Sequence, residues 1–305
     1  MIDAKRIVER RDLARIQDTL KEIRDNQGSK ATGVLAARYL SPQVRAELNE
    51  RELSYIDATG NMRISLASPA FYIGDRGADS DPWRGAGRPR ATLKGEPAAR
   101  VVRTLVDYAR EWRIKDLVNT AGSSVGATYR VIDYLETEGL LTKREGSGAL
   151  ALQDWSRLLR EWSIDYNAIA AGRVRQYIEP RGLNTFLARA AATATIPYAV
   201  TGSVAAAEWA PYAPSRSVFI YVSNTEAAEK EWGLRRTEAA SNVVLIEPKS
   251  PNDIVFANTA RRDDGLVLAA PAQVVVDLMN GPGRNPVEAE ELLTWMMANG
   301  DKWRK

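Results

Sequence analysis

The chemistry open to this chain is limited by two residue types that it lacks. Its 305 residues include neither cysteine nor histidine. Disulfides, the usual zinc sites and catalysis by a Ser-His-Asp or Cys-His set are therefore excluded. An enzyme of this composition would have to use carboxylates with magnesium, or lysine, tyrosine or serine side chains. The first question is whether the carboxylates stand where such chemistry needs them.

One candidate carboxylate is Asp57, in the stretch SYIDATGNMRIS. This stretch is similar to degenerate restriction-endonuclease-like cores, in which such an acid is a metal ligand. A nuclease of that class also needs a second acid and a lysine on the next strand, and here that strand reads MRISLAS. We therefore expect Asp57 to support the turn at Gly60 and Asn61, and we expect no metal site.

A second candidate site lies in the stretch YAVTGSVAAAEWAPYAPSRSVFIYVSN. It resembles the nucleotidyltransferase core, in which a strand leads to Gly-Ser at a helix start and the next strand carries two alternating aspartates for two magnesium ions. Gly202, Ser203 and Arg216 match that pattern. The acids would fall near Ile220 and Val222, and neither is acidic. The resemblance implies the scaffold without the catalysis, and a chance match in an unrelated α/β domain is the alternative.

The segment SSVGATYRVIDYLETEGLLTKREGSG predicts a helix followed by a hairpin. Two helices are expected before it, over 97–112 and 114–120, and a tight Ala-Gly turn separates them from the third. Either serine at its start can cap this third helix. Four residues share one face of it: Val125, Tyr129, Ile132 and Leu135. Short strands at 140–144 and 149–152 follow. This order is that of a winged helix-turn-helix, and the segment resembles the winged-helix domains of bacterial regulators.

A winged helix of this kind predicts a DNA interface. Small residues at the start of a recognition helix let its backbone approach the major groove, and its free N–H groups can meet a phosphate. We expect the recognition helix to span 123–138 and the wing 141–152. The predicted DNA contacts are Ser123, Ser124, Thr128, Tyr129 and Arg130 on the helix, with Lys143 and Arg144 on the wing. A winged helix that binds only proteins is the alternative.

The stretch before these helices is basic and rich in glycine and proline. Overall charge is only +3, so the basic middle of the chain, and not its total charge, indicates nucleic acid. The sequence Gly-Arg-Pro-Arg at 87–90 resembles an AT-hook segment, in which Arg88 and Arg90 would enter a narrow minor groove. A plain flexible basic linker is the alternative.

These segments divide the chain into four parts. We expect an N-terminal α/β unit over 1–77, a basic linker over 78–96, a winged helix-turn-helix domain with a trailing helix over 97–180, and a C-terminal nucleotidyltransferase-like domain over 181–305. The first part reads as an amphipathic helix over 1–25, a strand, a short helix after Ser41-Pro42, and a hairpin. The predicted fold class is α+β multidomain, with α/β units at both ends.

The combination of a winged helix with a nucleotidyltransferase-like domain lacking its acids resembles the AbiEi family of antitoxins from type IV toxin–antitoxin systems. Three further stretches fit that pattern: NVVLIEP at 242–248, DGLVLAAPAQVVVDLM at 264–279 and GPGR at 281–284. The resemblance runs from near Glu96 to the C-terminus, and the first 80 residues lie outside it. It implies autorepression at the promoter of the protein's own operon, and a cognate toxin that is an active nucleotidyltransferase.

The function expected from the sequence is that of a sequence-specific transcriptional repressor. It would bind double-stranded operator DNA, as a homodimer because winged-helix regulators usually read paired half-sites. We expect no catalytic residues, no metal and no cofactor. No apolar run is long enough to span a membrane and the N-terminus is charged, which predicts a cytoplasmic protein. Two alternatives stay open: a metal-dependent nucleotidyltransferase or nuclease, and a protein-only module that neutralises a toxin.

Overall fold

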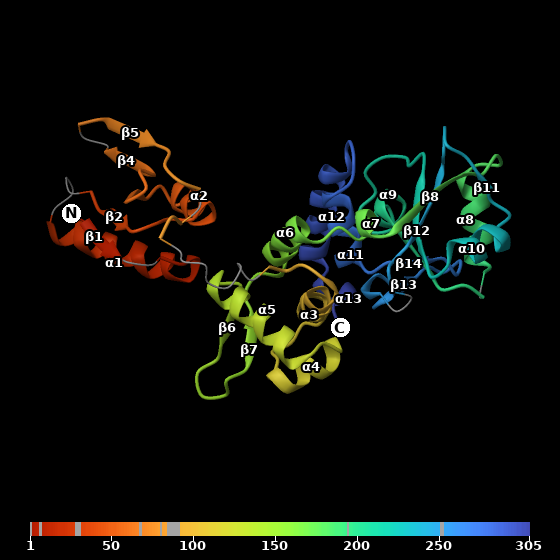
Figure 1. Ribbon diagram of the computed structural model, residues 1–305, viewed down its shortest axis with the longest axis horizontal. Coiled ribbons are helices and arrows are strands. Elements are labelled where there is room, and N and C mark those ends of the chain that lie inside the picture. Colours follow the sequence, from red (N-terminus) through yellow and green to blue (C-terminus); the bar gives the residue numbers. More distant parts are fainter. Residues whose placement is uncertain are drawn as a thin grey trace. The chain divides into compact units, whose positions relative to one another are not determined.

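The structure is a computed structural model that describes residues 2–5, 8–27, 32–66, 69–79, 81–83, 92–193, 195–250 and 253–305. Within these residues the chain is mixed α/β with several sheets, as the sequence predicts at this coarse level (Figure 1). The chain divides into two compact units. We call residues 1–91 with 132–142 the N-terminal unit, and residues 92–131 with 143–305 the larger unit.

The N-terminal unit is built on a five-stranded sheet in the order β1-β2-β3-β4-β5. The first three strands run parallel, and β4 and β5 continue the sheet as antiparallel neighbours. Helices follow β1 and β2, as parallel connections require. The elements are β1 (Ile2–Lys5), a 3₁₀ turn (Arg10–Asp12), α1 (Leu13–Gln27), β2 (Val34–Ala37), α2 (Pro42–Glu50), β3 (Ser54–Asp57), β4 (Met62–Leu66) and β5 (Phe71–Asp75).

The N-terminal helix begins later than its amphipathic pattern predicts. A helix was expected over 1–25, but residues 2–5 form β1 and the α-helix begins at Leu13. The buried residues Leu13, Ile16 and Leu20 are the part of the pattern that packs into the core. Residues 2–5 instead pair in parallel with β2, a long-range contact that local spacing does not reveal. The short helix after Ser41 is confirmed, and the Ser41 hydroxyl accepts from the Val44 N–H at 3.3 Å.

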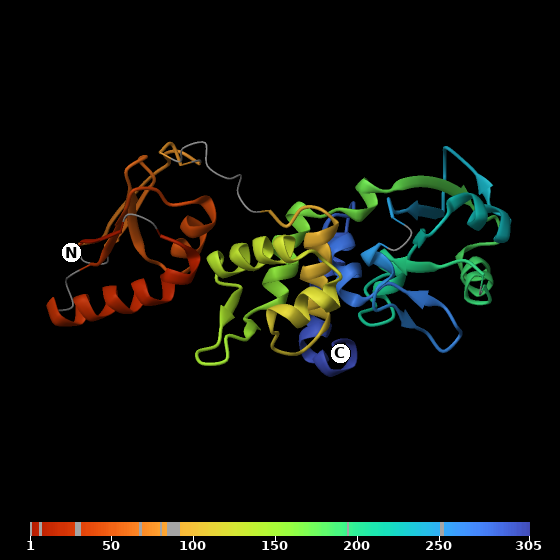
Figure 2. The ribbon, with the colours of Figure 1, turned by 60° about the horizontal axis from the view of Figure 1, so that its bottom comes forward.

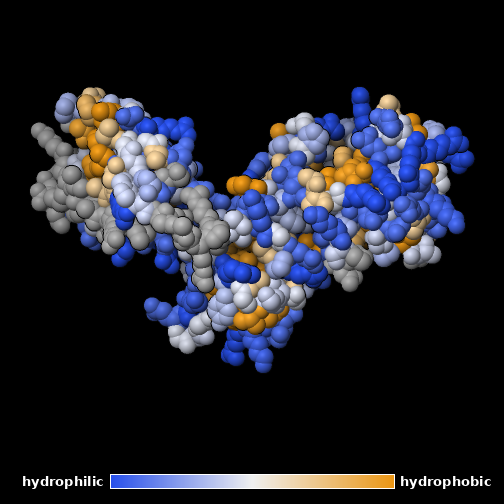
Figure 3. Space-filling view, in the orientation of Figure 1, coloured by the Kyte–Doolittle hydropathy of each residue, from blue (hydrophilic) through white to orange (hydrophobic). Residues whose placement is uncertain are grey.

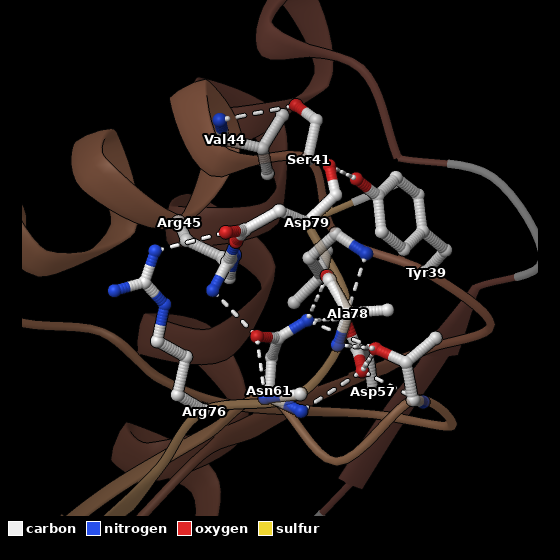
Figure 4. A network of polar contacts seen from close by, with 12 residues as sticks. Tyr39, Ser41, Val44, Arg45, Asp57, Asn61, Arg76, Ala78 and Asp79 are labelled. Atoms are coloured by element: carbon white, nitrogen blue, oxygen red, sulfur yellow. Dashed lines mark hydrogen bonds and ion pairs between the residues drawn. The ribbon is translucent and has the colours of Figure 1, made fainter. Parts of the chain in front are cut away.

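Asp57 supports the turn between β3 and β4, as the sequence predicts (Figure 4). Its Oδ1 accepts from the N–H and hydroxyl of Thr59 at 2.8 and 2.6 Å and from the Asn61 N–H at 3.1 Å. Its Oδ2 accepts from the Leu40 N–H at 3.0 Å and from the Asn61 amide at 2.9 Å. Burial acts to raise the pKa of Asp57, but these hydrogen bonds together lower it. Both oxygens of this carboxylate are therefore engaged, by four hydrogen bonds from the turn and one from Leu40.

Replacing Gly77 with alanine is expected to destabilise the N-terminal unit by about 1–3 kcal/mol. The Gly77 N–H donates to the Asn61 side chain at 2.9 Å, and an added Cβ would overlap the backbone of Thr59 and Asn61. Thermal unfolding followed by circular dichroism would measure the loss. Gly126→Ala is the control, because a Cβ there meets no atom within 4 Å and glycine disfavours a helix interior. Equal stability of Gly77→Ala and the wild type would contradict this packing.

The sheet of the N-terminal unit buries one face and exposes the other. Leu35 and Tyr55 lie on the face that packs against the helices. The opposite face carries Ile56, Ile73 and Phe71, which are between 36% and 49% exposed. Figure 3 shows apolar side chains gathered over β4 and β5. This is the arrangement of a sheet covered by helices on one side only.

Helices and a short hairpin come next along the chain, and they belong to the larger unit except for residues 132–142, which include the second half of α5 and most of β6. Helix α3 ends at Asp107 and not near residue 112, because Tyr108 is extended at φ −115°. The hairpin of β6 and β7 projects from the end of α5 (Figures 1 and 2). The helix α6 buries Leu158, Leu159 and Trp162, as expected of the trailing helix. The elements are α3 (Glu96–Asp107), α4 (Ile114–Ala121), α5 (Val125–Thr137), β6 (Leu141–Lys143), β7 (Leu150–Leu152), α6 (Trp155–Asp165) and α7 (Ala168–Ala171).

A seven-stranded mixed sheet forms the rest of the larger unit, in the order β11-β8-β12-β10-β9-β14-β13. β10 is parallel to β12 and antiparallel to β9. β8 lies before the predicted boundary at 180, yet it pairs inside this sheet with β12. The strands are β8 (Arg173–Ile178), β9 (Tyr198–Thr201), β10 (Val218–Val222), β11 (Arg235–Arg236), β12 (Val243–Glu247), β13 (Ala260–Arg261) and β14 (Val267–Leu268). The helices are α8 (Leu183–Ala191), α9 (Gly202–Ala206), α10 (Thr225–Glu231), a 3₁₀ turn (Ile254–Phe256), α11 (Pro271–Met279), α12 (Asn285–Ala298) and α13 (Gly300–Trp303).

Candidate nucleic-acid interface

The turn between α4 and α5 is made by a glycine and a serine cap. Gly122 ends α4 in the left-handed conformation at φ 59°, which favours glycine. Ser124 then begins α5, because its hydroxyl accepts from the Ala127 N–H at 3.3 Å and its carbonyl accepts from the Thr128 N–H at 2.9 Å. Of the two serines expected as caps, Ser124 has this role. Ser123 is half-buried, and among the described residues its buried hydroxyl oxygen has no hydrogen-bond partner.

The outer face of α5 differs from the face predicted by its apolar pattern. Val125 and Tyr129 are 57% and 44% exposed, whereas Ile132 and Leu135 are buried. The four residues therefore do not share one buried stripe. Arg130 is exposed on the same side as Tyr129, and a Cβ at Gly126 would meet no atom within 4 Å. The start of α5 thus presents an open surface that a groove could approach closely.

Thr128 was expected to face DNA, and this expectation is wrong for the described conformation. Its side chain is fully buried, and its hydroxyl donates to the Ser124 carbonyl at 3.1 Å. The neighbouring Ala127 is also buried, as is Val131 one turn of the helix later. Thr128 therefore lies on the inner face of α5. The polar type of threonine suggested exposure, but its position on the helix decides its burial.

The wing has the two strands that the sequence predicts, closed by a glycine-rich turn. The Arg144 N–H donates to the Ala149 carbonyl at 2.8 Å, and Gly146 and Gly148 adopt left-handed conformations. Lys143 and Arg144 are both exposed. Arg144 Nε lies 2.7 Å from Glu111 Oε1, so its charge is partly compensated by a surface pair. The structure therefore places both predicted wing residues at the surface, with Lys143 at the end of β6.

The segment between α3 and α4 pairs with strand β7 of the wing. This pairing was not predicted from the sequence. Trp112 bridges β7 antiparallel, with its N–H and carbonyl bonded to Leu150 at 2.9 and 2.8 Å. The Arg110 guanidinium stacks over the Trp112 ring with 3.8 Å to its centroid. Two more exposed basic residues, Arg113 and Lys115, stand at the start of α4. These basic residues belong to the basic middle of the chain that the sequence already indicated.

The linker arginines Arg88 and Arg90 lie outside the described residues. Their predicted entry into the minor groove stays a prediction.

A buried polar chain connects α3 to α11 within the larger unit. Arg103 is 0% exposed, and its Nη2 donates to Asp107 Oδ2 at 2.8 Å. Its Nη1 donates to the side-chain oxygen Oε1 of Gln273 at 3.1 Å. The Gln273 amide then donates to Asp277 Oδ1 at 2.9 Å. Helix α3 is thereby hydrogen-bonded, through the Arg103 and Gln273 side chains, to the core beside the seven-stranded sheet.

Asp277 ends this chain of hydrogen bonds in a buried position. It is 3% exposed and accepts hydroxyl hydrogen bonds from Thr201 at 2.6 Å and from Tyr221 at 2.9 Å. Burial raises the pKa of Asp277 to about 6, although the hydrogen bonds from Thr201, Tyr221 and Gln273 act to lower it. A carboxyl group with a pKa in this range changes protonation in mildly acidic solution.

Asp277 is expected to make the larger unit less stable as pH rises from about 4 to about 6. Because its pKa is higher in the folded state, the folded state holds the extra proton in this range, and that stabilisation is lost as the carboxyl ionises. The loss is on the order of 2 kcal/mol. Asp277→Asn should flatten this part of the pH profile of thermal unfolding, and the exposed Asp263→Asn should not. A profile of Asp277→Asn parallel to the wild type between these pH values would count against the buried proton.

The nucleotidyltransferase-like stretch has no acids at the positions that would bind metal. Gly202 begins α9 directly after β9, and Ile220 and Val222 of β10 are fully buried. In the described parts of the chain, no three acidic side chains lie together in a way that could hold a metal ion. Arg216 is exposed just before β10, at the wall of a cavity that does not include Gly202 or Ser203.

Comparisons of the chain with protein-family models, with curated proteins and with solved structures gave no match. Among the helices of the described residues, none combines the length and the apolar character needed to cross a membrane.

Proposed function

We propose that this chain is a sequence-specific DNA-binding transcriptional regulator that acts as a repressor. The observation that carries the proposal is the two-sided character of α5. Its inner face buries Ala127, Thr128 and Val131, while Gly126, Tyr129 and Arg130 are exposed, and a Cβ at Gly126 would meet no atom within 4 Å. A recognition helix needs this combination, because the inner face fixes its position and the outer face has to reach base edges.

The order of elements around α5 supports the same proposal. α3, the bridging residue Trp112, α4, α5 and the hairpin β6–β7 follow one another as in a winged helix-turn-helix. We assign base contacts to Tyr129 and Arg130. We assign contacts with the DNA backbone to Ser124, which is exposed at the start of α5. Four exposed basic residues would make further backbone contacts: Arg113, Lys115, Lys143 and Arg144. Arg88 and Arg90 would add minor-groove contacts.

The sheet of the larger unit supports an antitoxin-like role over an enzymatic one. β9 leads into Gly202 and Ser203, β10 returns antiparallel, and β12 lies parallel to β10, an order compatible with the nucleotidyltransferase-like fold suggested by the sequence. The catalytic acids are missing from β10. We therefore propose a non-catalytic AbiEi-like protein of the cytoplasm, which binds operator DNA as a homodimer and a nucleotidyltransferase toxin as partner.

Selection of bound genomic DNA is the experiment that tests this function. The purified full chain would be mixed with sheared DNA of its source organism, and bound fragments sequenced and then used in gel shifts at about 50 and 200 mM salt. We expect a small set of enriched sites, including one upstream of the protein's own gene, with affinity that falls steeply with salt. Uniform recovery of all fragments would contradict specific binding, and magnesium-dependent nucleotide transfer by the same preparation would contradict the non-catalytic assignment.

A further inference from the structure

A basic cavity opens in the larger unit, away from α5 and the wing. Its volume is about 410 Å³, within the range of small-molecule sites. The segments that form it come from three places in the chain: the start of α8, the segment before β10 and the start of β12. The lining residues are Arg181, Gly182, Leu183, Asn184, Ser215, Arg216 and Asn242.

The residues that line this cavity carry positive charge. Arg181 and Arg216 are both exposed, and within the described residues no ion pair joins either guanidinium to a carboxylate, although the Glu179 carboxylate interacts electrostatically with Arg181. None of the seven lining residues is acidic. The nearest carboxylate along the chain, Glu179, is already used, because it accepts from the Arg181 backbone N–H at 3.0 Å and pairs with Arg189. Two guanidinium groups that line one cavity, neither of them held in an ion pair within the described residues, give it a positive potential that favours an anion.

The fold holds the two arginine segments in place. The Asn242 side chain connects the end of β8 to the start of β12. Its Oδ1 accepts from the Glu179 N–H at 2.8 Å, and its Nδ2 donates to the Glu179 carbonyl at 3.0 Å. Arg284 anchors the segment before Arg216 by donating to the Pro214 carbonyl at 2.7 Å. Gly182, at φ 87°, begins α8 at the cavity, so the first N–H groups of a nine-residue helix add to the positive potential.

We propose that this cavity binds the phosphate group of a small phosphorylated molecule, with Arg181 and Arg216 as its two guanidinium ligands. The planar guanidinium forms paired hydrogen bonds to phosphate oxygens, and two of them match the double negative charge of a phosphate monoester. Ser215 and Asn184 supply neutral polar groups at the same wall. The site is distinct from Gly202 and Ser203, and it gives the larger unit a ligand that the proposed DNA-binding function does not require.

Titration with inorganic pyrophosphate, inorganic phosphate and acetate at matched ionic strength tests the proposal, with binding measured by calorimetry on the full chain. We expect saturable binding of pyrophosphate and phosphate. Arg181→Ala and Arg216→Ala should each weaken it about tenfold, and the double variant should abolish it. Arg216→Lys keeps the charge without the paired donors and should lie between the wild type and Arg216→Ala. Lys230→Ala, which removes an exposed charge from α10, should bind like the wild type.

Three outcomes would overturn the proposal. The wild type could show no saturable binding of either phosphate probe, the double variant could bind as tightly as the wild type, or acetate could bind as tightly as phosphate, which would make this a carboxylate site. Thermal unfolding without ligand checks that the arginine variants are folded. Loss of DNA binding is not a readout here, so failure of this proposal and failure of the proposed function remain separate results.

Discussion

Arg130→Ala is expected to weaken binding of the operator by about 1–3 kcal/mol, or roughly 5- to 150-fold. Arg130 is exposed in the second turn of α5, beside Tyr129 and the open surface at Gly126, and has no acidic partner in the described residues. If it reads a base, its loss should also relax the preference at one base pair while leaving binding to unrelated DNA almost unchanged. Gel shifts with the selected operator and with single-base variants of it would measure both effects.

Two other variants separate base reading from general attraction to DNA. Lys143→Ala on the wing should weaken binding to all sequences alike and reduce the slope of affinity against salt by about one. Arg235→Ala removes an exposed arginine from β11, at the opposite end of the larger unit from the wing (Figure 1), and should change neither. If Arg130→Ala behaves like Arg235→Ala, α5 is not the recognition helix.

Arg103→Met is expected to destabilise the larger unit by about 3–5 kcal/mol. The Arg103 and Asp107 side chains are only 1% and 3% exposed. The variant would leave the Asp107 carboxylate buried, and among the described residues its remaining side-chain hydrogen-bond donor is the Asn258 amide, at 2.7 Å. Gln273 would lose its Arg103 donor as well. Urea unfolding of the variant and the wild type, extrapolated to water, would measure the difference.

The same helix provides the matched control. Arg100 pairs with Glu96 at 2.6 Å and with the same spacing of four residues, but these side chains are 27% and 44% exposed. Arg100→Ala should therefore cost no more than about 1 kcal/mol. Removing both buried charges in Arg103→Met with Asp107→Leu should recover part of the stability, because no unpaired carboxylate remains. Equal losses for Arg100→Ala and Arg103→Met would mean that burial does not determine the value of the pair.

The sequence predicted several turns and helix ends correctly, because their conformations depend on the types of a few neighbouring residues. Gly122 takes a left-handed conformation, Ser124 caps the next helix, and Asp57 bonds the turn at Asn61. Each of these contacts joins residues at most four positions apart. A residue type that suits such a conformation is therefore visible in the sequence before any tertiary contact is known.

The faces of α5 were predicted less well, for a physical reason. Helical periodicity identifies residues that lie on one face, but not how much of that face meets the core. Val125, Tyr129 and Ile132 lie on one face of the helix. The structure exposes Val125 and Tyr129 and buries Ile132, so burial changes along the length of this face. Periodicity also did not show that the polar side chain of Thr128 is buried. Nor could it show that residues 2–5 form a strand, because that strand depends on pairing with the distant strand β2.

The sequence by itself determined which chemistry is impossible for this protein and where its local turns and caps fall. The absence of cysteine and histidine, and of acids at positions 220 and 222, is a property of composition and needs no fold. Only the tertiary structure decided that Arg103 is buried against Asp107 and Gln273, and that Arg181 and Arg216 line one cavity. Burial and convergence arise from contacts between residues far apart in the chain, and local spacing carries no record of them.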